Sequence, residues 1–255
     1  MRNKQIKKLV FNLSEGLLST VTDLLLLQFY IFGASLGKGK TSRGAYRAVE
    51  EATKELEEFN YQTLKQTFDH LKRKGLIRSL QEPIITQLGK QRLNSLVPEY
   101  QQIRTWDKVI YLVTYDIQET KRLYRNKLRE VLRKLGAAPL QASVWLTPYN
   151  PEKILREFSS TPGFAGEIIV SCVGKDGYIG EEQLGDLIYR IYNLDKINQR
   201  YQQFIDQYKQ SHDKWNAAVL YLSILKDDPQ LPFELLADDW VGDQAYLIYK
   251  NLTKN

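Results

Sequence analysis

The sequence predicts an α+β protein with three parts: a helical N-terminal module with a short hairpin, a central α/β domain and a helical C-terminal segment. Before residue 97, helical apolar spacing surrounds two short strand-like runs. After it, β-branched and aromatic runs alternate with amphipathic helices as far as residue 192, and the remainder is helical and rich in aromatic residues. We place the parts at residues 1–100, 105–193 and 194–255.

The charge of the chain is unevenly distributed. The net charge is +6, but residues 1–104 carry 17 Lys and Arg against 10 Asp and Glu, whereas residues 105–255 carry 19 against 20. A basic module joined to a near-neutral one predicts that the first part binds a polyanion such as double-stranded DNA. A basic surface that serves only solubility is the alternative.

Composition narrows the class of protein. With 255 residues, of which 43% are hydrophobic, the chain can form the cores of two small domains, so a disordered chain is not expected. Cys172 is the single cysteine, which leaves neither a disulfide framework nor a cysteine zinc site. The apolar run Leu24–Leu27 is too short to span a membrane, and the basic start lacks a signal-peptide cleavage site. We therefore expect a cytoplasmic protein without a membrane partner.

The N-terminal part opens with an apolar segment, residues 17–36, that predicts a buried helix. A glycine-rich basic stretch follows at Gly37–Gly44, and the charged segment Ala45–Glu58 predicts a solvated helix. The letters GKGKTS resemble a phosphate loop, but they lack the GxxxxGK[ST] spacing and follow a helix instead of a strand. Nucleotide binding is therefore not expected.

The next segment has the order helix, hairpin, helix. Asn60 is a good N-cap for an amphipathic helix over Tyr61–Lys74, and Gly75 ends it. Two apolar runs flank the turn residues Gln81–Glu82, and Thr86 predicts the start of a further helix that ends near residue 96. This order is typical of a winged helix-turn-helix.

A helix of that kind fits the major groove of DNA, where polar residues at its N-terminal end reach base edges and surrounding cations neutralise phosphates. An ordinary amphipathic helix with a solvated face is the alternative, and a module that binds a protein is another. The candidates for base edges are Tyr61, Gln62, Lys65 and Gln66. The candidates for phosphate contacts are Lys72, Arg73, Lys74 and Arg78.

The central part predicts a ferredoxin-like open sheet with helices on one face. The expected strands are Val109–Tyr115, Leu140–Thr147 and Glu167–Val173, with Tyr178–Ile179 as a possible closing strand. The expected helices are Glu119–Leu135, Pro151–Phe158 and Glu181–Tyr192.

The first of these helices is strongly basic. Its segment Lys121–Lys134 holds seven Lys and Arg against the single acid Glu130. Such a helix can contact a DNA backbone, an acidic partner or an anionic ligand, and a helix that is only solvated is equally consistent with the sequence.

Asp116 is the single candidate for catalysis or metal binding. It lies just past the end of the first strand, where α/β sheets often carry functional groups, but a carboxylate there can equally cap the turn. His70 and His212, the two histidines, are far apart and have no second carboxylate at ligand spacing. We therefore expect no enzyme activity and no cofactor.

The C-terminal part predicts helices from residue 194 to Leu225 and over Gln244–Leu252. Its aromatic residues can line a pocket for a flat ligand, but helix–helix core is the more common role of such residues.

Five stretches of the chain resemble the PaaX-type repressors of phenylacetate and related aromatic catabolism. The stretches are Tyr115–Ile117, Arg125–Gly136, Leu140–Tyr149, Asp228–Leu236 and Asp239–Gly242. The resemblance implies a dimeric repressor with an N-terminal winged helix, a central ferredoxin-like domain and a helical C-terminal domain. It also implies release from the operator by an aryl-coenzyme A thioester, a small-molecule effector. The Gly37–Glu58 stretch departs from the family in its length and charge.

The central domain also looks like the small ferredoxin-fold CRISPR adaptation protein, described as a metal-dependent nuclease or an integrase scaffold. In that family an aspartate at the end of the first strand is the candidate metal ligand, and Asp116 occupies the matching position. The resemblance implies an alternative function for the chain as a nuclease or nucleic-acid scaffold. The length of the chain and the Asp228–Leu236 segment do not fit that single-domain family.

Overall fold

The fold of the chain is taken from a computed structural model, which describes residues 23, 26, 27, 31, 66, 69–78, 84–94, 97–174, 178–179 and 181–253. The chain divides into two compact units. One unit, called the sheet unit here, consists of residues 101–196 and 229–240. The other consists of residues 1–100, 197–228 and 241–255.

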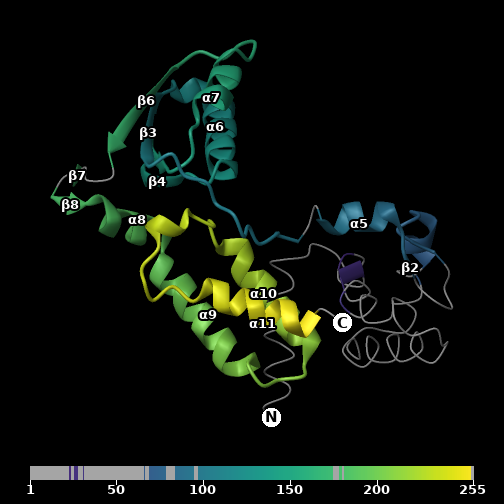
Figure 1. Ribbon diagram of the computed structural model, residues 1–255. Helices are drawn as coiled ribbons and strands as arrows, with labels where there is room; N and C mark the ends of the chain where they lie inside the picture. The colour runs from purple at the N-terminus through teal and green to yellow at the C-terminus, as the bar shows by residue number, and fades with distance from the viewer. Residues whose placement is uncertain are drawn as a thin grey trace. The chain divides into compact units, whose positions relative to one another are not determined.

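The sheet unit is built around four antiparallel strands in the order β4-β5-β3-β6 (Figure 1). The strands are β3 (Val109–Asp116), β4 (Ala138–Gln141), β5 (Val144–Thr147) and β6 (Glu167–Gly174). The helices that connect them are η1 (Glu119–Lys121), α6 (Arg122–Lys134) and α7 (Glu152–Ser159). The chain order β3-α6-β4-β5-α7-β6 is the βαββαβ order of a ferredoxin-like fold.

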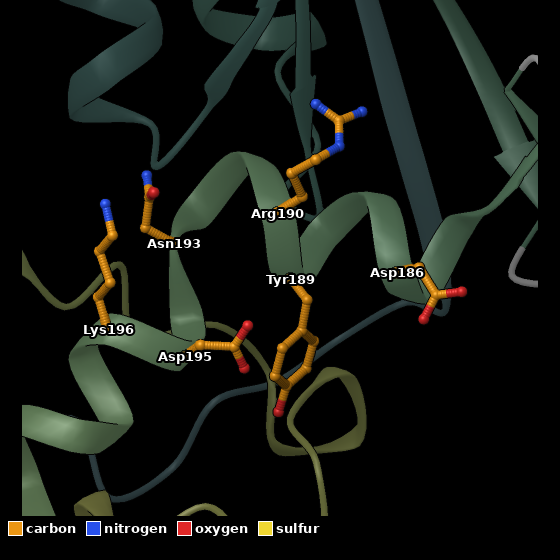
Figure 2. A pocket seen from close by; sticks show the side chains of 6 residues that line it. All are labelled: Asp186, Tyr189, Arg190, Asn193, Asp195 and Lys196. Atoms are coloured by element: carbon orange, nitrogen blue, oxygen red, sulfur yellow. The ribbon is translucent and has the colours of Figure 1, made fainter.

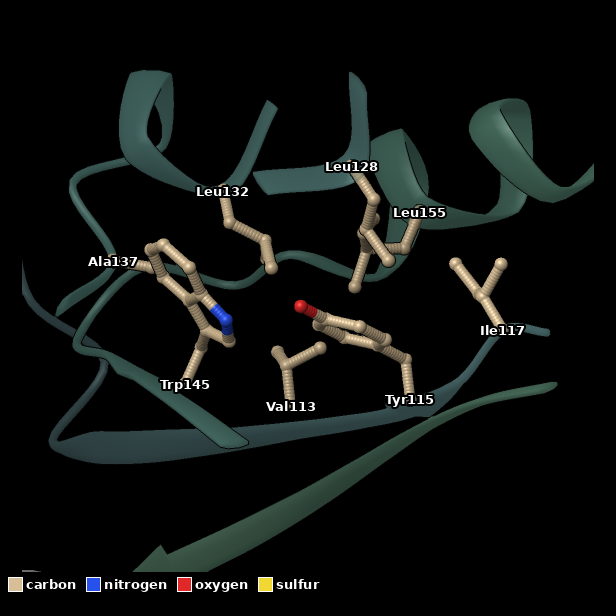
Figure 3. Close-up of a cluster of buried hydrophobic side chains, with 8 residues drawn as sticks. All are labelled: Val113, Tyr115, Ile117, Leu128, Leu132, Ala137, Trp145 and Leu155. Atoms are coloured by element: carbon tan, nitrogen blue, oxygen red, sulfur yellow. The ribbon is translucent and has the colours of Figure 1, made fainter. Parts of the chain in front are cut away.

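One face of the sheet packs against α6 and α7. Figure 3 shows Val113, Tyr115 and Trp145 pointing from the strands toward leucines on the two helices. Leu128 and Leu132, both fully buried, belong to α6 and lie four residues apart, so they fall on the same side of that helix. This apolar contact fixes α6 on the sheet and leaves its opposite side in solvent.

The other face of the sheet is also covered. Ile110 and Leu146 pack there against Leu184, Leu187 and Ile188 of α8 (Leu184–Tyr192), together with the segment 229–240. The expectation that helices cover one face only was therefore wrong. The physical reason is the strand sequence itself, since β3 carries apolar side chains at successive positions and not only at alternate ones.

Polar contacts hold the 229–240 segment in place. Gln230 adopts a left-handed backbone conformation with φ of 50°. Its side-chain oxygen accepts a hydrogen bond from the Gln101 amide at 2.7 Å, and its carbonyl accepts one from the Tyr149 hydroxyl at 2.8 Å. The next carbonyl, of the fully buried Leu231, accepts from the buried Arg104 guanidinium at 2.9 Å. The segment is thus an ordered cover for the sheet.

Two details of the expected sheet were wrong. The strand expected over Leu140–Thr147 is two strands, because the chain reverses at Ala142–Ser143 between β4 and β5. The pair Tyr178–Ile179 (β7) does not close the main sheet, because it pairs with β8 (Glu182–Gln183) in a separate two-stranded sheet.

The C-terminal helices are α9 (Leu194–Tyr208), α10 (Lys214–Asp227) and α11 (Gly242–Thr253), with a short η2 (Phe233–Leu235) before α11. The region expected to continue helically to Leu225 is interrupted after Tyr208. Helix α10 begins at Lys214, and its N-cap is Asp213, whose carboxylate accepts from the Asn216 amide at 3.0 Å. Tyr201, Phe204 and Tyr221 are fully buried between α9 and α10. These aromatic residues are therefore core, and they do not line an open pocket.

The described N-terminal elements are the helical residues 69–73, β1 (Ile77–Arg78), β2 (Ile84–Ile85) and α5 (Gln87–Asn94). Gly75 ends the helical residues with φ of +67°, as its position predicts. The two strands form an antiparallel hairpin in which Ile77 pairs with Ile85. The start of the helix expected over Tyr61–Lys74 lies outside the described residues, so the complete winged helix-turn-helix stays a prediction.

Thr86 and Gly89 set the position of α5. The Thr86 hydroxyl donates to the Gly75 carbonyl at 2.6 Å and accepts from the Gly89 amide at 3.1 Å. Thr86 is therefore the N-cap of α5, as predicted. A Cβ on Gly89 would lie 2.2 Å from the Leu76 carbonyl oxygen. Helix α5 therefore crosses the hairpin at a distance that only glycine permits.

This close crossing predicts opposite effects for one substitution at two helical glycines. Gly89→Ala should destabilise the N-terminal module by about 2 kcal/mol, because backbone must move to admit the methyl group. Gly185→Ala in α8, where no atom lies within 4 Å of the new Cβ, should stabilise by roughly 0.5–1 kcal/mol through helix propensity. Urea unfolding measures both variants, with hydrogen exchange followed over residues 84–94 for Gly89→Ala and over residues 184–192 for Gly185→Ala. Equal effects of the two variants would contradict the close crossing.

Candidate nucleic-acid interface

The described residues among the predicted DNA contacts are all exposed. Lys72 and Arg73 end the helical segment, Lys74 follows at its turn, and Arg78 lies in β1 across from Ile84. Gln66 is helical and exposed. The guanidinium of Arg73 donates to the Asp69 carbonyl of the preceding turn at 3.4 Å. The remaining candidates, Tyr61, Gln62 and Lys65, lie outside the described residues.

An ion pair between a half-exposed arginine and a buried aspartate joins α5 to the apolar N-terminal segment. Arg92 of α5 donates two hydrogen bonds, both of 3.1 Å, to the two carboxylate oxygens of Asp23. Asp23 is 2% exposed and is a helical residue of the apolar N-terminal segment. A fork of this geometry is the strong form of a charged hydrogen bond, and it fixes α5 to that segment. The sequence reading did not identify this pair, because the two residues are 69 positions apart.

Asp116 is the exposed last residue of β3. Across the sheet its Cα partner is Glu167, the first residue of β6. A Cβ on the neighbouring Gly166 would meet the Asp116 carbonyl oxygen at 2.7 Å, so the chain enters β6 in close contact with the end of β3. The backbones of two acidic residues thus lie opposite each other at this end of the sheet. Within the described ranges, no three His, Cys, Asp or Glu side chains gather as a metal site.

The basic helix α6 divides its cations between internal and outward positions. Arg125 donates to the Ile117 carbonyl at 2.6 Å, which ties the helix to the end of β3. Arg129 donates to the Tyr115 hydroxyl at 2.9 Å and to the Ala142 carbonyl at 3.1 Å, which ties it to the β4–β5 turn. These two arginines have structural roles that the sequence did not reveal.

The remaining charges of α6 face solvent. Lys134 lies 2.8 Å from Glu130, and this hydrogen bond lowers the pKa of the Glu130 carboxyl. The Arg133 guanidinium lies 5.5 Å from the ring centroid of Trp145, within the range of a cation–π contact. Arg122 and Lys127 are exposed and form no ion pair with any described residue. The helix therefore presents more positive charge than its own fold uses.

A surface pocket of about 530 Å³ lies where α8 meets α9 (Figure 2). The Arg190 guanidinium already donates a hydrogen bond to the Glu182 carboxylate at 2.6 Å. The Tyr189 hydroxyl accepts a hydrogen bond from the Ala237 amide, and burial raises the pKa of this tyrosine. Figure 2 shows Tyr189 and Arg190 pointing to opposite sides of α8, so the lining groups do not converge on one bound atom. The pocket is lined by Asp186, Tyr189, Arg190, Asn193, Asp195 and Lys196.

The described helices include none that is both long enough and apolar enough to cross a membrane.

Comparison with known families gives two matches that follow one another along the chain. Residues 103–184 match the family profile described as the PaaX protein central Cas2-like domain. Residues 192–255 match the profile described as the PaaX-like protein C-terminal domain. No curated protein sequence matches the chain significantly.

Among solved structures, the chain is similar to the uncharacterized protein Rv0674 from Mycobacterium tuberculosis. The TM-score is 0.51 and the sequence identity is 17%, over 76% of this chain and 81% of that one. At this identity the similarity concerns the fold alone.

Proposed function

Because the chain belongs to the PaaX-like family, we propose that it is a sequence-specific DNA-binding regulator of transcription. Family membership, carried by adjacent matches to the central and C-terminal domains, is the observation on which the proposal rests. In this proposal residues 1–100 read DNA as a winged helix-turn-helix, residues 105–193 form the central domain and residues 194–255 complete the protein as a helical domain.

The charge distribution supports the N-terminal part as the reader of DNA. Residues 1–104 carry 17 Lys and Arg against 10 Asp and Glu, and this positive excess favours a phosphate backbone as the partner. The described end of that module supports the same role, because the exposed Lys72 and Lys74 lie at the end of the helical residues and the exposed Arg78 lies in the hairpin that follows. A wing of this kind contacts the backbone beside the groove that the recognition helix enters.

The proposal includes repression that an effector relieves. Family resemblance supports a repressor that an acyl- or aryl-coenzyme A thioester releases from its operator. Such a ligand would act by binding the DNA-free form more tightly than the DNA-bound form, since only differential affinity shifts the equilibrium.

A homodimer is also part of the proposal, because two winged helices would read two half-sites of a palindromic operator. The edges of the central sheet support this. Strand β4 is short, contains Pro139 and has a register irregularity, and these are three devices that prevent edge pairing. Strand β6 has eight residues, no proline and an Ile169 side chain that is 57% exposed. We propose that β6 pairs with its copy in a second chain.

The alternative function is a metal-dependent nuclease or a nucleic-acid scaffold that uses Asp116. The observation in its favour is the pairing of Asp116 with Glu167 at the end of the sheet, since carboxylates are the usual ligands of Mg²⁺. It is a second candidate, and one experiment separates it from the first.

That experiment is a salt titration of binding to a labelled duplex from the gene's own upstream region and to a scrambled duplex. We expect tighter binding to the upstream duplex, a steep salt slope and intact DNA with or without magnesium. An aryl-coenzyme A thioester that releases the DNA would identify the effector class. Cleavage that needs magnesium and disappears in Asp116→Ala would favour the nuclease. Binding to neither duplex would favour a protein partner for the basic module.

Two substitutions test how the N-terminal module reads DNA. Arg78→Ala should weaken binding to both duplexes alike and flatten the salt slope by about 1, because a phosphate contact is lost. Lys65→Ala should lower the preference for the upstream duplex, by about 1–3 kcal/mol if it contacts a base edge. Fluorescence anisotropy measures both, with Lys153→Ala of α7 as a control of equal charge. Unchanged affinity in both variants would place the DNA surface elsewhere.

A charge at the sheet edge tests the dimer. Ile169→Lys places an ammonium group in the proposed β6–β6 contact and should raise the dimer dissociation constant at least about tenfold. Ile154→Lys is the control, because Ile154 is also exposed, at 39%, but lies on α7. Sedimentation velocity over a concentration series measures the dissociation constant. A wild-type monomer, or equal effects of both variants, would contradict pairing through β6.

A further inference from the structure

We propose that one solvent-facing flank of α6 is a second nucleic-acid contact, in which Arg122, the half-buried Arg129 and Arg133 bind the sugar–phosphate backbone of duplex DNA. The inference rests on the proposed DNA-binding function and adds a surface in the sheet unit to the N-terminal module. The three residues are called the arginine row.

The spacing of the arginine row places it on one side of the helix. Positions i, i+7 and i+11 fall within about 40° of one another around an α-helix and span about 16 Å along it. This side lies about 100° around the helix from the buried Leu128 and Leu132, which pack on the sheet, so the row runs along the flank of α6. An extended straight row of this length can meet several phosphates of one strand, which rise about 3.4 Å per nucleotide.

Two of the three arginines, Arg129 and Arg133, are held in place by contacts that leave donors available. Arg129 uses Nε and one Nη for the Tyr115 hydroxyl and the Ala142 carbonyl, so three of its five N–H groups remain. Arg133 lies against the ring of the buried Trp145. Because the guanidinium groups are already ordered, binding a phosphate costs less side-chain entropy than it would for free lysines.

The surroundings of the row favour an anion. Glu130 is the single acid of α6, and its carboxylate already binds Lys134 at 2.8 Å. The β4–β5 turn beside Arg129 consists of uncharged residues, Gln141 to Ser143. Glu119 precedes the helix in η1, and its carboxylate is paired with Arg125 at 3.5 Å.

A DNA backbone fits this surface better than an acidic protein does. Protein interfaces are usually centred on buried aromatic and apolar side chains, with charges at the rim. On the exposed side of α6 the one large apolar residue is Leu123, which is 65% exposed. The surface is instead a line of cations, and guanidinium groups bind phosphate oxygens in pairs.

The test is the salt dependence of duplex binding by the full chain carrying Arg122→Gln and Arg133→Gln. Arg129 is left unchanged because it holds the helix to the sheet. We expect the log–log salt slope to fall by about 1.8, at roughly 0.9 for each phosphate contact, equally for the upstream and the scrambled duplex. The charge-conserving pair Arg122→Lys and Arg133→Lys should keep most of the slope.

A matched control removes the same net charge from another helix of the sheet unit, through Lys153→Gln and Arg156→Gln on α7. If this control lowers the slope as much as the α6 pair, general attraction explains the effect and the arginine row is overturned. An α6 pair with the wild-type slope and unchanged upstream preference overturns the row and leaves the proposed function standing. A wild-type chain that binds neither duplex overturns both.

Discussion

Strand β3 presents apolar side chains to both faces of the sheet, with Val113 and Tyr115 on one side and Ile110 and Leu112 on the other. A strand of this kind has to be covered twice, because an uncovered face would expose a contiguous apolar patch to water. Helices α6 and α7 cover the first face, as the βαββαβ order requires. The second face is covered by parts that come later in the chain.

The cover of the second face explains the Asp228–Leu236 sequence. Leu231 is fully buried there beside α8, and the backbone around it is tied down by Arg104 and by the Tyr149 hydroxyl. Proline at positions 229 and 232 restricts the backbone of a segment that has no helix or strand bonds of its own. The segment that resembles the family thus covers the apolar face of the sheet, a structural role that requires no ligand.

The same reasoning explains which elements could be predicted from the sequence. The strands β3 and β6 are rich in β-branched residues, and α6 has leucines four residues apart with Gly136 after its end, so local pattern was sufficient. The β4–β5 turn was missed because Ala142 and Ser143 carry no glycine or proline signal. The start of α10 was visible in Asp213, but the apolar pattern on both sides concealed the break.

Long-range contacts also limit what the sequence alone predicts about the candidate site. A count of basic residues identified α6, but it did not separate Arg125 and Arg129, which bind carbonyls of the sheet unit, from Arg122, which projects into solvent. That distinction depends on where the carbonyls of Ile117 and Ala142 come to lie, and it requires the fold. The Asp23–Arg92 pair has the same character, because each residue alone reads as an ordinary charged position.

A shared fold does not by itself decide between a regulator and a nuclease, because function depends on the residues placed on it. The two family matches cover residues 103–184 and 192–255, so every residue assigned to base reading lies outside both. The matched regions supply the scaffold, and the proposed phosphate contacts of α6 would add affinity without sequence preference. In the proposed regulator, the preferred DNA sequence would therefore be a property of the N-terminal module of this chain and could not be transferred from its relatives.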